Sequence, residues 1–93
     1  MLYMIIERFK GRDGVSVYRR FDEKGRMAPE GLTYINSWVE PNFDRCYQVM
    51  ECDDVALIYQ WIANWDDLVD FEIIPVVTSA EAREIIKPLI WKH

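Results

Sequence analysis

The chain is short of histidine, cysteine and glycine, and each shortage removes a class of function. Its only histidine is His93, so axial haem ligation, zinc binding and Ser-His or Cys-His nucleophiles lack a partner. The two cysteines, Cys46 and Cys52, lie around the end of one predicted strand and are badly placed to pair. Four glycines form no phosphate-binding loop. We therefore expect no metal and no cofactor.

Long apolar runs and positive charge are also lacking. The longest hydrophobic runs fall far below the roughly 18–20 residues of a membrane span, so we expect no membrane partner. Eleven basic against 16 acidic residues give a net charge of −5, which repels nucleic acid. Unpaired cysteines without a signal peptide favour a reducing, cytoplasmic location.

Hydrophobic residues are abundant in what remains, at 51% of 93 residues with 14% aromatic. This length predicts one domain, 1–93. Strands are predicted at 2–9, 32–39, 45–51 and 69–77 from their β-branched and aromatic residues. So many apolar residues in so small a chain indicate either a dense core or an additional apolar surface that meets a partner.

Helices are predicted between these strands and after the last one. Asp13 caps a helix over 14–24, and Gly25 ends it. A second helix starts at Asp53 or Asp54 and ends at 66–67; its apolar side chains recur at helical spacing, at Ile58, Trp61, Ile62 and Trp65. A third follows the capping box Thr78–Glu81, and Pro88 should end or kink it near Ile86 or Lys87.

The element order predicts an α+β fold. Two βαβ units joined by a hairpin give a ferredoxin-like βαββαβ sandwich with an extra C-terminal helix. Its four-stranded antiparallel sheet has the strand order 4-1-3-2, which makes the strand that holds Pro75 an edge strand.

Alternation along the strands divides their side chains between two faces. The more apolar set is expected under the two crossover helices: Met4, Ile6, Ile35, Val39, Tyr47, Val49, Phe71 and Ile73. The other set is expected on the uncovered face: Tyr3, Ile5, Glu7, Tyr34, Asn36, Trp38, Cys46, Gln48, Met50, Glu72, Ile74 and Val76. Because this second set is too bulky for water, we expect a homodimer packed sheet to sheet. The alternatives are cover by the last helix with the tail 89–93, or by another protein.

The chain also resembles a small bacterial family catalogued as domain of unknown function 3303. The resemblance is carried by LYMIIERF (2–9), APEGL (28–32), SWV (37–39), RCYQVMEC (45–52), WDDLVDFEIIPV (65–76) and TSAEA (78–82). It implies membership of the dimeric α+β barrel superfamily, in which two four-stranded sheets close on each other. That superfamily includes cofactor-free and haem-degrading monooxygenases and muconolactone isomerases, and a shared fold does not fix the activity.

A candidate ligand site follows from the uncovered face. Aromatic walls with a few polar groups suit a small planar ligand, and a buried carboxyl gains the raised pKa of a general base. The expected binding residues are Glu7, Tyr34, Asn36, Trp38, Gln48 and Glu72. We predict a small-ligand-binding or interaction module. The alternatives are a cofactor-independent monooxygenase or isomerase-like enzyme acting on a small aromatic or quinone-like substrate, and a structural subunit that docks another protein.

Overall fold

Four strands, three α-helices and one short 3-10 helix make up the fold of residues 1–91. A computed structural model describes residues 1–91, so His93 and the end of the tail 89–93 lie outside it. The elements are β1 (Leu2–Phe9), η1 (Lys10–Arg12), α1 (Gly14–Lys24), β2 (Thr33–Val39), β3 (Arg45–Glu51), α2 (Ala56–Ile62), β4 (Val69–Val76) and α3 (Ser79–Ile90). The predicted segments match closely except at the ends of α2 and α3, and the α+β class is confirmed.

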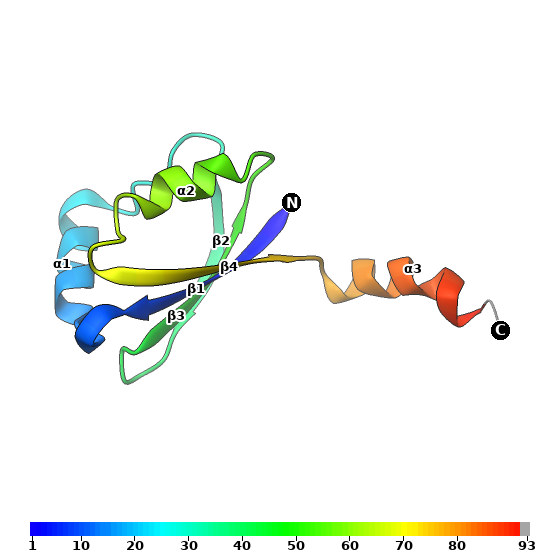
Figure 1. The fold of residues 1–93 in the computed structure, drawn as a ribbon, viewed down its shortest axis with the longest axis horizontal. Helices are drawn as coiled ribbons and strands as arrows, with labels where there is room; N and C mark the ends of the chain where they lie inside the picture. Colours follow the sequence, from blue (N-terminus) through cyan, green and yellow to red (C-terminus); the bar gives the residue numbers. More distant parts are fainter. Residues whose placement is uncertain (92–93) are drawn as a thin grey trace.

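The strands form one antiparallel sheet in the order β2-β3-β1-β4. This is the expected order 4-1-3-2 read from the opposite edge. Pro75 lies in the edge strand β4, where a missing N–H is tolerated. Figure 1 shows α1 and α2 on one side of the sheet, while α3 leads away from the end of β4. We call the side without helices the open face.

Local signals determine both ends of α1. The Asp13 carboxylate accepts hydrogen bonds from the Ser16 backbone N–H (3.0 Å) and hydroxyl (2.6 Å), as expected of an N-cap. At the other end, the Gly25 N–H donates to the Phe21 carbonyl at 2.7 Å. Gly25 has φ 69° and ψ −163°, a conformation almost restricted to glycine. The chain therefore turns sharply out of α1 into the loop that begins with Arg26.

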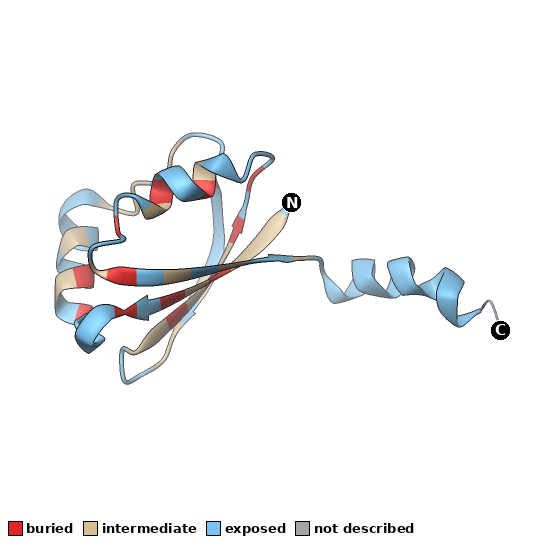
Figure 2. Ribbon diagram, in the orientation of Figure 1, coloured by how far each residue is buried: buried red, intermediate tan, exposed pale blue. Residues whose placement is uncertain are grey.

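The hydrophobic core lies between the sheet and these two helices. Ile58 and Trp61 of α2 are buried, and Trp61 meets Phe71 of β4 edge to face with ring centroids 5.4 Å apart. Ile5 of β1 and Met50 of β3 are fully buried beneath them. Figure 2 shows buried positions along the strands and on α1 and α2, and none on α3. Full burial of each large apolar side chain contributes roughly 1.5–3 kcal/mol.

The structure reverses the expected faces of β1 and β3. The register aligns Ile5 with Gln48 and Ile73, and side chains directly opposite each other share a face. Alternation defines two sets in each strand but does not say which set the helices cover. The predictions for these two strands were therefore wrong: Tyr3, Ile5, Glu7, Cys46, Gln48 and Met50 lie on the helix side, and Met4, Ile6, Tyr47 and Val49 lie on the open face. For β4 the prediction was correct, with Phe71 and Ile73 on the helix side.

A β-bulge changes the alternation within β2. Tyr34 pairs with Met50 and Asn36 pairs with Val49, so Ile35 is an extra residue without a partner. The Ile35 side chain is 51% exposed rather than covered by the helices. Beyond the bulge, Asn36 and Trp38 face the open side. The helix side receives Tyr34, Ser37 and Val39.

The third helix differs from its prediction at its C-terminal end. Thr78 caps it, because its hydroxyl accepts a hydrogen bond from the Glu81 N–H at 3.1 Å. The helix then continues through Pro88 to Ile90, although Pro88 has no N–H to donate. Every residue of α3 is exposed, so within this chain it does not cover the open face. Among residues 1–91 no helix has the length and hydropathy needed to span a bilayer.

Replacing Gly25 should be more costly than replacing Gly11, although open space surrounds the Cβ that alanine would add at either position. Gly11, at φ 63° and ψ 17°, is in a left-handed region that other residues adopt at moderate cost. We expect Gly25→Ala to lower the free energy of unfolding by about 1–3 kcal/mol and Gly11→Ala to lower it by less. Urea denaturation of both variants measures the difference, and equal losses would contradict the role given to Gly25.

Candidate functional site

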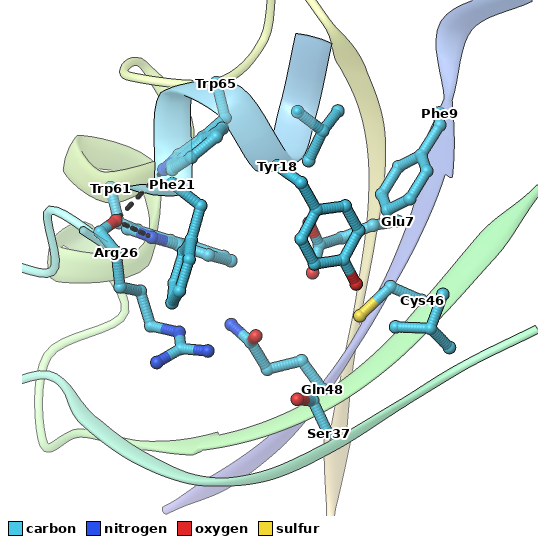
Figure 3. Close-up of a pocket in the computed structure, with 12 residues that line it drawn as sticks. Glu7, Phe9, Tyr18, Phe21, Arg26, Ser37, Cys46, Gln48, Trp61 and Trp65 are labelled. Atoms are coloured by element: carbon cyan, nitrogen blue, oxygen red, sulfur yellow. Dashed lines mark hydrogen bonds between the residues drawn. The ribbon is translucent and has the colours of Figure 1, made fainter. Parts of the chain in front are cut away.

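A pocket of about 240 Å³ lies between the helix side of the sheet and the two helices that cover it. Its floor comes from β1 and β3, and its walls come from α1, α2 and the loop after α1. Figure 3 shows the polar ends of Arg26, Gln48, Tyr18 and Cys46 around a common space. The complete lining is Glu7, Phe9, Val17, Tyr18, Phe21, Arg26, Ser37, Val39, Cys46, Gln48, Trp61 and Trp65.

Glu7 is a buried carboxyl at the floor of this pocket. It is 8% exposed, and the register places it directly beside Cys46 of β3. Burial raises the pKa of Glu7 to about 7, against the smaller opposing effects of a hydrogen bond with Cys46 and the positive charge of Arg26. Glu7 therefore exchanges its proton near neutral pH, where a general acid or base is most useful.

Gln48 is the second buried polar group of the floor, with 4% exposure. Its amide nitrogen donates to the Met50 sulfur at 3.2 Å, and sulfur is a weak acceptor. Among the side-chain hydrogen bonds of residues 1–91, none involves the side-chain amide oxygen (Oε1) of Gln48. This amide therefore retains hydrogen-bonding capacity for a molecule in the pocket.

Tyr18 lies on the α1 side, between two other aromatic rings. Phe9 and Phe43 contact it edge to face, with ring centroids 6.3 Å and 5.9 Å away. Burial raises the pKa of the Tyr18 hydroxyl, and the charges of Cys46 and Glu7 raise it further. The hydroxyl therefore stays protonated at neutral pH and can donate a hydrogen bond.

Arg26 forms the rim, and its backbone is held from α2. Its carbonyl oxygen accepts hydrogen bonds from two indole N–H groups, those of Trp61 at 2.9 Å and Trp65 at 3.0 Å (Figure 3). The guanidinium stacks on the Tyr34 ring, 3.6 Å from its centroid, and lies 5.1 Å from the Phe21 centroid. Backbone and side chain are thus both positioned, as a preorganised binding group requires.

The structure separates the six residues expected to form one site. Glu7 and Gln48 line the pocket, and Tyr34 lies beside it, under the Arg26 guanidinium. The other three are on the open face: Asn36, Trp38 and Glu72. The expectation that all six share one face was therefore wrong, because β1 and β3 present the opposite sides and β2 contains a bulge. Their role in binding a ligand stays a prediction.

Sequence reasoning did not identify the rim or the aromatic walls as part of a site. Arg26 directly follows the glycine that ends the helix predicted over 14–24, and Tyr18 lies within that helix, positions that do not by themselves mark a side chain as part of a site. Trp61 and Trp65 were predicted on the apolar side of the second helix and are buried, but their indole N–H groups also need acceptors. The available sequence signal for this site was the pair Trp61 and Trp65, four residues apart, together with the glycine that ends the first helix.

The other reactive groups of the pocket favour acid–base chemistry over nucleophilic chemistry. Burial and the adjacent Glu7 raise the pKa of the Cys46 thiol to about 12, so it is protonated and a poor nucleophile. Within residues 1–91, His, Cys, Asp and Glu side chains nowhere form a group of three that suits a metal ion. Glu7, Gln48 and Tyr18 together can exchange a proton with a bound molecule and hydrogen-bond to it.

The raised pKa of Glu7 predicts that stability falls as the pH rises. The folded protein holds this proton more tightly than the unfolded chain, so the contribution is complete below pH 4.5 and is lost as the pH passes about 7. This loss amounts to about 3 kcal/mol. Glu7→Gln should remove it and leave the variant more stable than the parent at pH 8. Chemical denaturation at pH 5 and pH 8 measures the change, with exposed Glu23→Gln as the control; parallel profiles for Glu7→Gln and the parent would contradict the assignment.

Comparison with known proteins gives one family and no further relatives. Residues 1–90 match the family described as a domain of unknown function, DUF3303. The chain matches no curated protein and no solved structure. Because the match covers all the strands and helices described above, the chain belongs to the DUF3303 family.

Proposed function

We propose that this protein binds a small organic molecule in the pocket between the sheet and helices α1 and α2. The observation that carries the proposal is the buried pair Glu7 and Gln48, whose polar groups reach into an apolar cavity. Apolar walls with a few convergent polar groups are typical of small-molecule sites. The volume of about 240 Å³ suits one ring, since an engineered cavity of about 150 Å³ holds benzene.

A purely structural role explains these two residues poorly. A buried carboxyl with a pKa near 7 lowers stability at neutral pH by about 3 kcal/mol, a large part of the roughly 5–15 kcal/mol that holds a domain together. Burial of the Gln48 side-chain amide is compensated only by a weak hydrogen bond to the Met50 sulfur. Perturbed carboxyls in clefts are common at functional sites, which supports binding or catalysis over packing.

Two copies of the chain pack through their open faces in this proposal. That face is rich in large apolar groups and has no helix over it: Leu2, Met4, Ile6, Ile35, Trp38, Tyr47, Val49, Ile74 and Val76. Trp38 is 56% exposed in the single chain. Such a patch is unfavourable in water, and a second sheet of the same kind covers it by a two-fold arrangement. Apolar side chains of α3, exposed beyond the end of β4, can extend that contact onto the partner.

The second candidate function is a cofactor-independent enzyme acting on a small aromatic or quinone-like substrate. The pKa of Glu7 favours it, because a general base needs a pKa near the working pH. Its base is Glu7, with Gln48 and Tyr18 as hydrogen-bonding partners. Asn36 and Trp38 lie on the other face of the same sheet, so an isomerase-like proton transfer fits the pocket better than an oxygenase built on those two residues.

Blocking the pocket should abolish ligand binding. Ser37 lines the pocket and Asn36, next to it in β2, faces the other way. We expect Ser37→Phe to remove the small molecule that native mass spectrometry detects on protein purified from cells, because the added ring occupies the cavity. Asn36→Phe should retain it. Thermal denaturation checks that both variants fold. A ligand that persists in Ser37→Phe would contradict the proposal. So would a parent protein that carries no ligand and binds none from a ligand panel.

A charge on the open face should dissociate the dimer. Ile6 is near the middle of that face, on the central strand β1, whereas Val15 is an exposed apolar residue of α1. Light scattering after size exclusion should give twice the chain mass for the parent and for Val15→Lys, and the chain mass for Ile6→Lys. A monomeric parent at micromolar concentration would favour the alternative in which the open face docks another protein.

A further inference from the structure

The charge of Arg26 distinguishes the rim of the pocket from its floor. Arg26 is the only cationic side chain among the residues that line the cavity, in a chain whose net charge is −5. The ion pairs within residues 1–91 use other arginines and lysines, and Arg26 takes part in none of them. Its charge acts on Glu7 within the pocket, but this half-buried guanidinium forms no ion pair and is therefore available to bind an anion.

The stacking of Arg26 leaves its hydrogen-bonding edge available. Its Cζ lies 3.6 Å from the centroid of the Tyr34 ring, a separation at which a guanidinium stacks flat on the ring and keeps its N–H donors at its edge. No hydrogen bond from these donors occurs within residues 1–91, whereas Arg20 uses its own donors on Asp67 and the Asn64 carbonyl. The free edge matches the two oxygens of a carboxylate.

The remainder of the pocket determines what the anion is attached to. Phe21, Trp61 and Trp65 provide aromatic surface between the rim and the floor, and about 240 Å³ accommodates a single substituted ring. The floor then offers Gln48 and Glu7 to a hydroxyl or carbonyl group at the far end of that ring. A ligand entering with its charge last keeps that charge near solvent, where its desolvation costs least.

We propose that the pocket takes a planar aromatic carboxylate, with its carboxylate on Arg26, its ring against the aromatic walls and a polar substituent at Gln48 and Glu7. This inference rests on the proposed ligand-binding function and names the chemical class of the ligand. The class excludes aromatic ligands that carry a positively charged ammonium group, because Arg26 repels a cation, and it ranks neutral analogues below the acids.

Four probes test the preference: benzoate, benzamide, 4-hydroxybenzoate and 4-hydroxybenzamide, added at pH 6 to the full chain labelled with ¹⁵N. The indole N–H signals of Trp61 and Trp65 report the pocket, whereas those of Trp38 and Trp91 are remote controls in the same spectrum. We expect each acid to bind at least tenfold more tightly than its amide, a difference of about 1.4 kcal/mol. Only the Trp61 and Trp65 signals should shift with ligand.

Variants then locate the preference at Arg26. Arg26→Met should reduce the advantage of acid over amide to below threefold, and Arg26→Lys should retain part of it. The control Arg19→Met makes the same change of net charge at an exposed position outside the pocket, and it should leave the advantage intact. Equal binding of acid and amide by the parent, a comparison that needs no variant, would overturn the inference while leaving ligand binding in place. A preference that survives Arg26→Met would overturn it as well. If none of the four shifts the Trp61 and Trp65 signals, the inference falls, and the small-molecule function falls too if no other ligand is found.

Discussion

The carbonyl oxygen of Arg26 accepts hydrogen bonds from two tryptophans, and the geometry of the pocket depends on this contact. Trp61 and Trp65 both belong to the segment of α2 and the turn that follows it, and both are buried. They connect the loop after α1 to the second helix, and a 3.3 Å hydrogen bond from Asn64 to the Met27 carbonyl adds a third link. These hydrogen bonds hold α1 and α2, which are far apart in the sequence, over the same sheet with a cavity between them.

That constraint also explains the unusual backbone on either side of Arg26. Gly25 has φ 69° and Met27 has φ 60°, so two residues with left-handed φ flank Arg26. A methionine in this region is strained, and such strain persists only where the surrounding contacts enforce it. This backbone conformation lets the Arg26 carbonyl point to α2 while the Arg26 guanidinium lies over Tyr34 at the rim. The loop thus works as a positioned binding element and not merely as a connection.

Local chemistry in the sequence was enough to predict the order of the strands and helices and most of their bounds, except at the ends of α2 and α3. The side chains of Asp13 and Thr78 cap helix N-termini, and Gly25, which has no side chain, ends a helix. Pro75, which lacks an N–H, lies in an edge strand. The faces of the sheet were harder, because alternation gives two sets and the more apolar one was assigned to the helices. That choice was correct for β4 but fails for β1 and β3, since Glu7 and Gln48 lie under the helices. A ranking by hydrophobicity cannot recognise a buried polar pocket or an apolar face awaiting a partner.

The candidate site was predicted only in part for the same reason. Glu7 and Gln48 were correctly predicted to lie close together, because they share one face of the sheet whichever side the helices cover. Asn36 and Trp38 were separated from them by the single extra residue of a bulge, which no alternation pattern reveals. Arg26 belongs to a loop, where side-chain direction depends on tertiary contacts. The case for a second copy rests on the large apolar side chains left exposed on the open face, among them Trp38 and Ile74.

The buried carboxyl of Glu7 at the floor of the pocket is central to this account, since it explains both the loss of stability that the site causes at neutral pH and the acid–base capacity of the site. The most direct test is a ¹³C nuclear magnetic resonance titration of the Glu7 side-chain carboxyl between pH 3 and pH 9. The account predicts a midpoint near pH 7, because burial disfavours the carboxylate. A midpoint near the ordinary value of 4.5 would contradict the account, because desolvation of Glu7 would then not dominate its titration and the acid–base role given to this carboxyl would be lost.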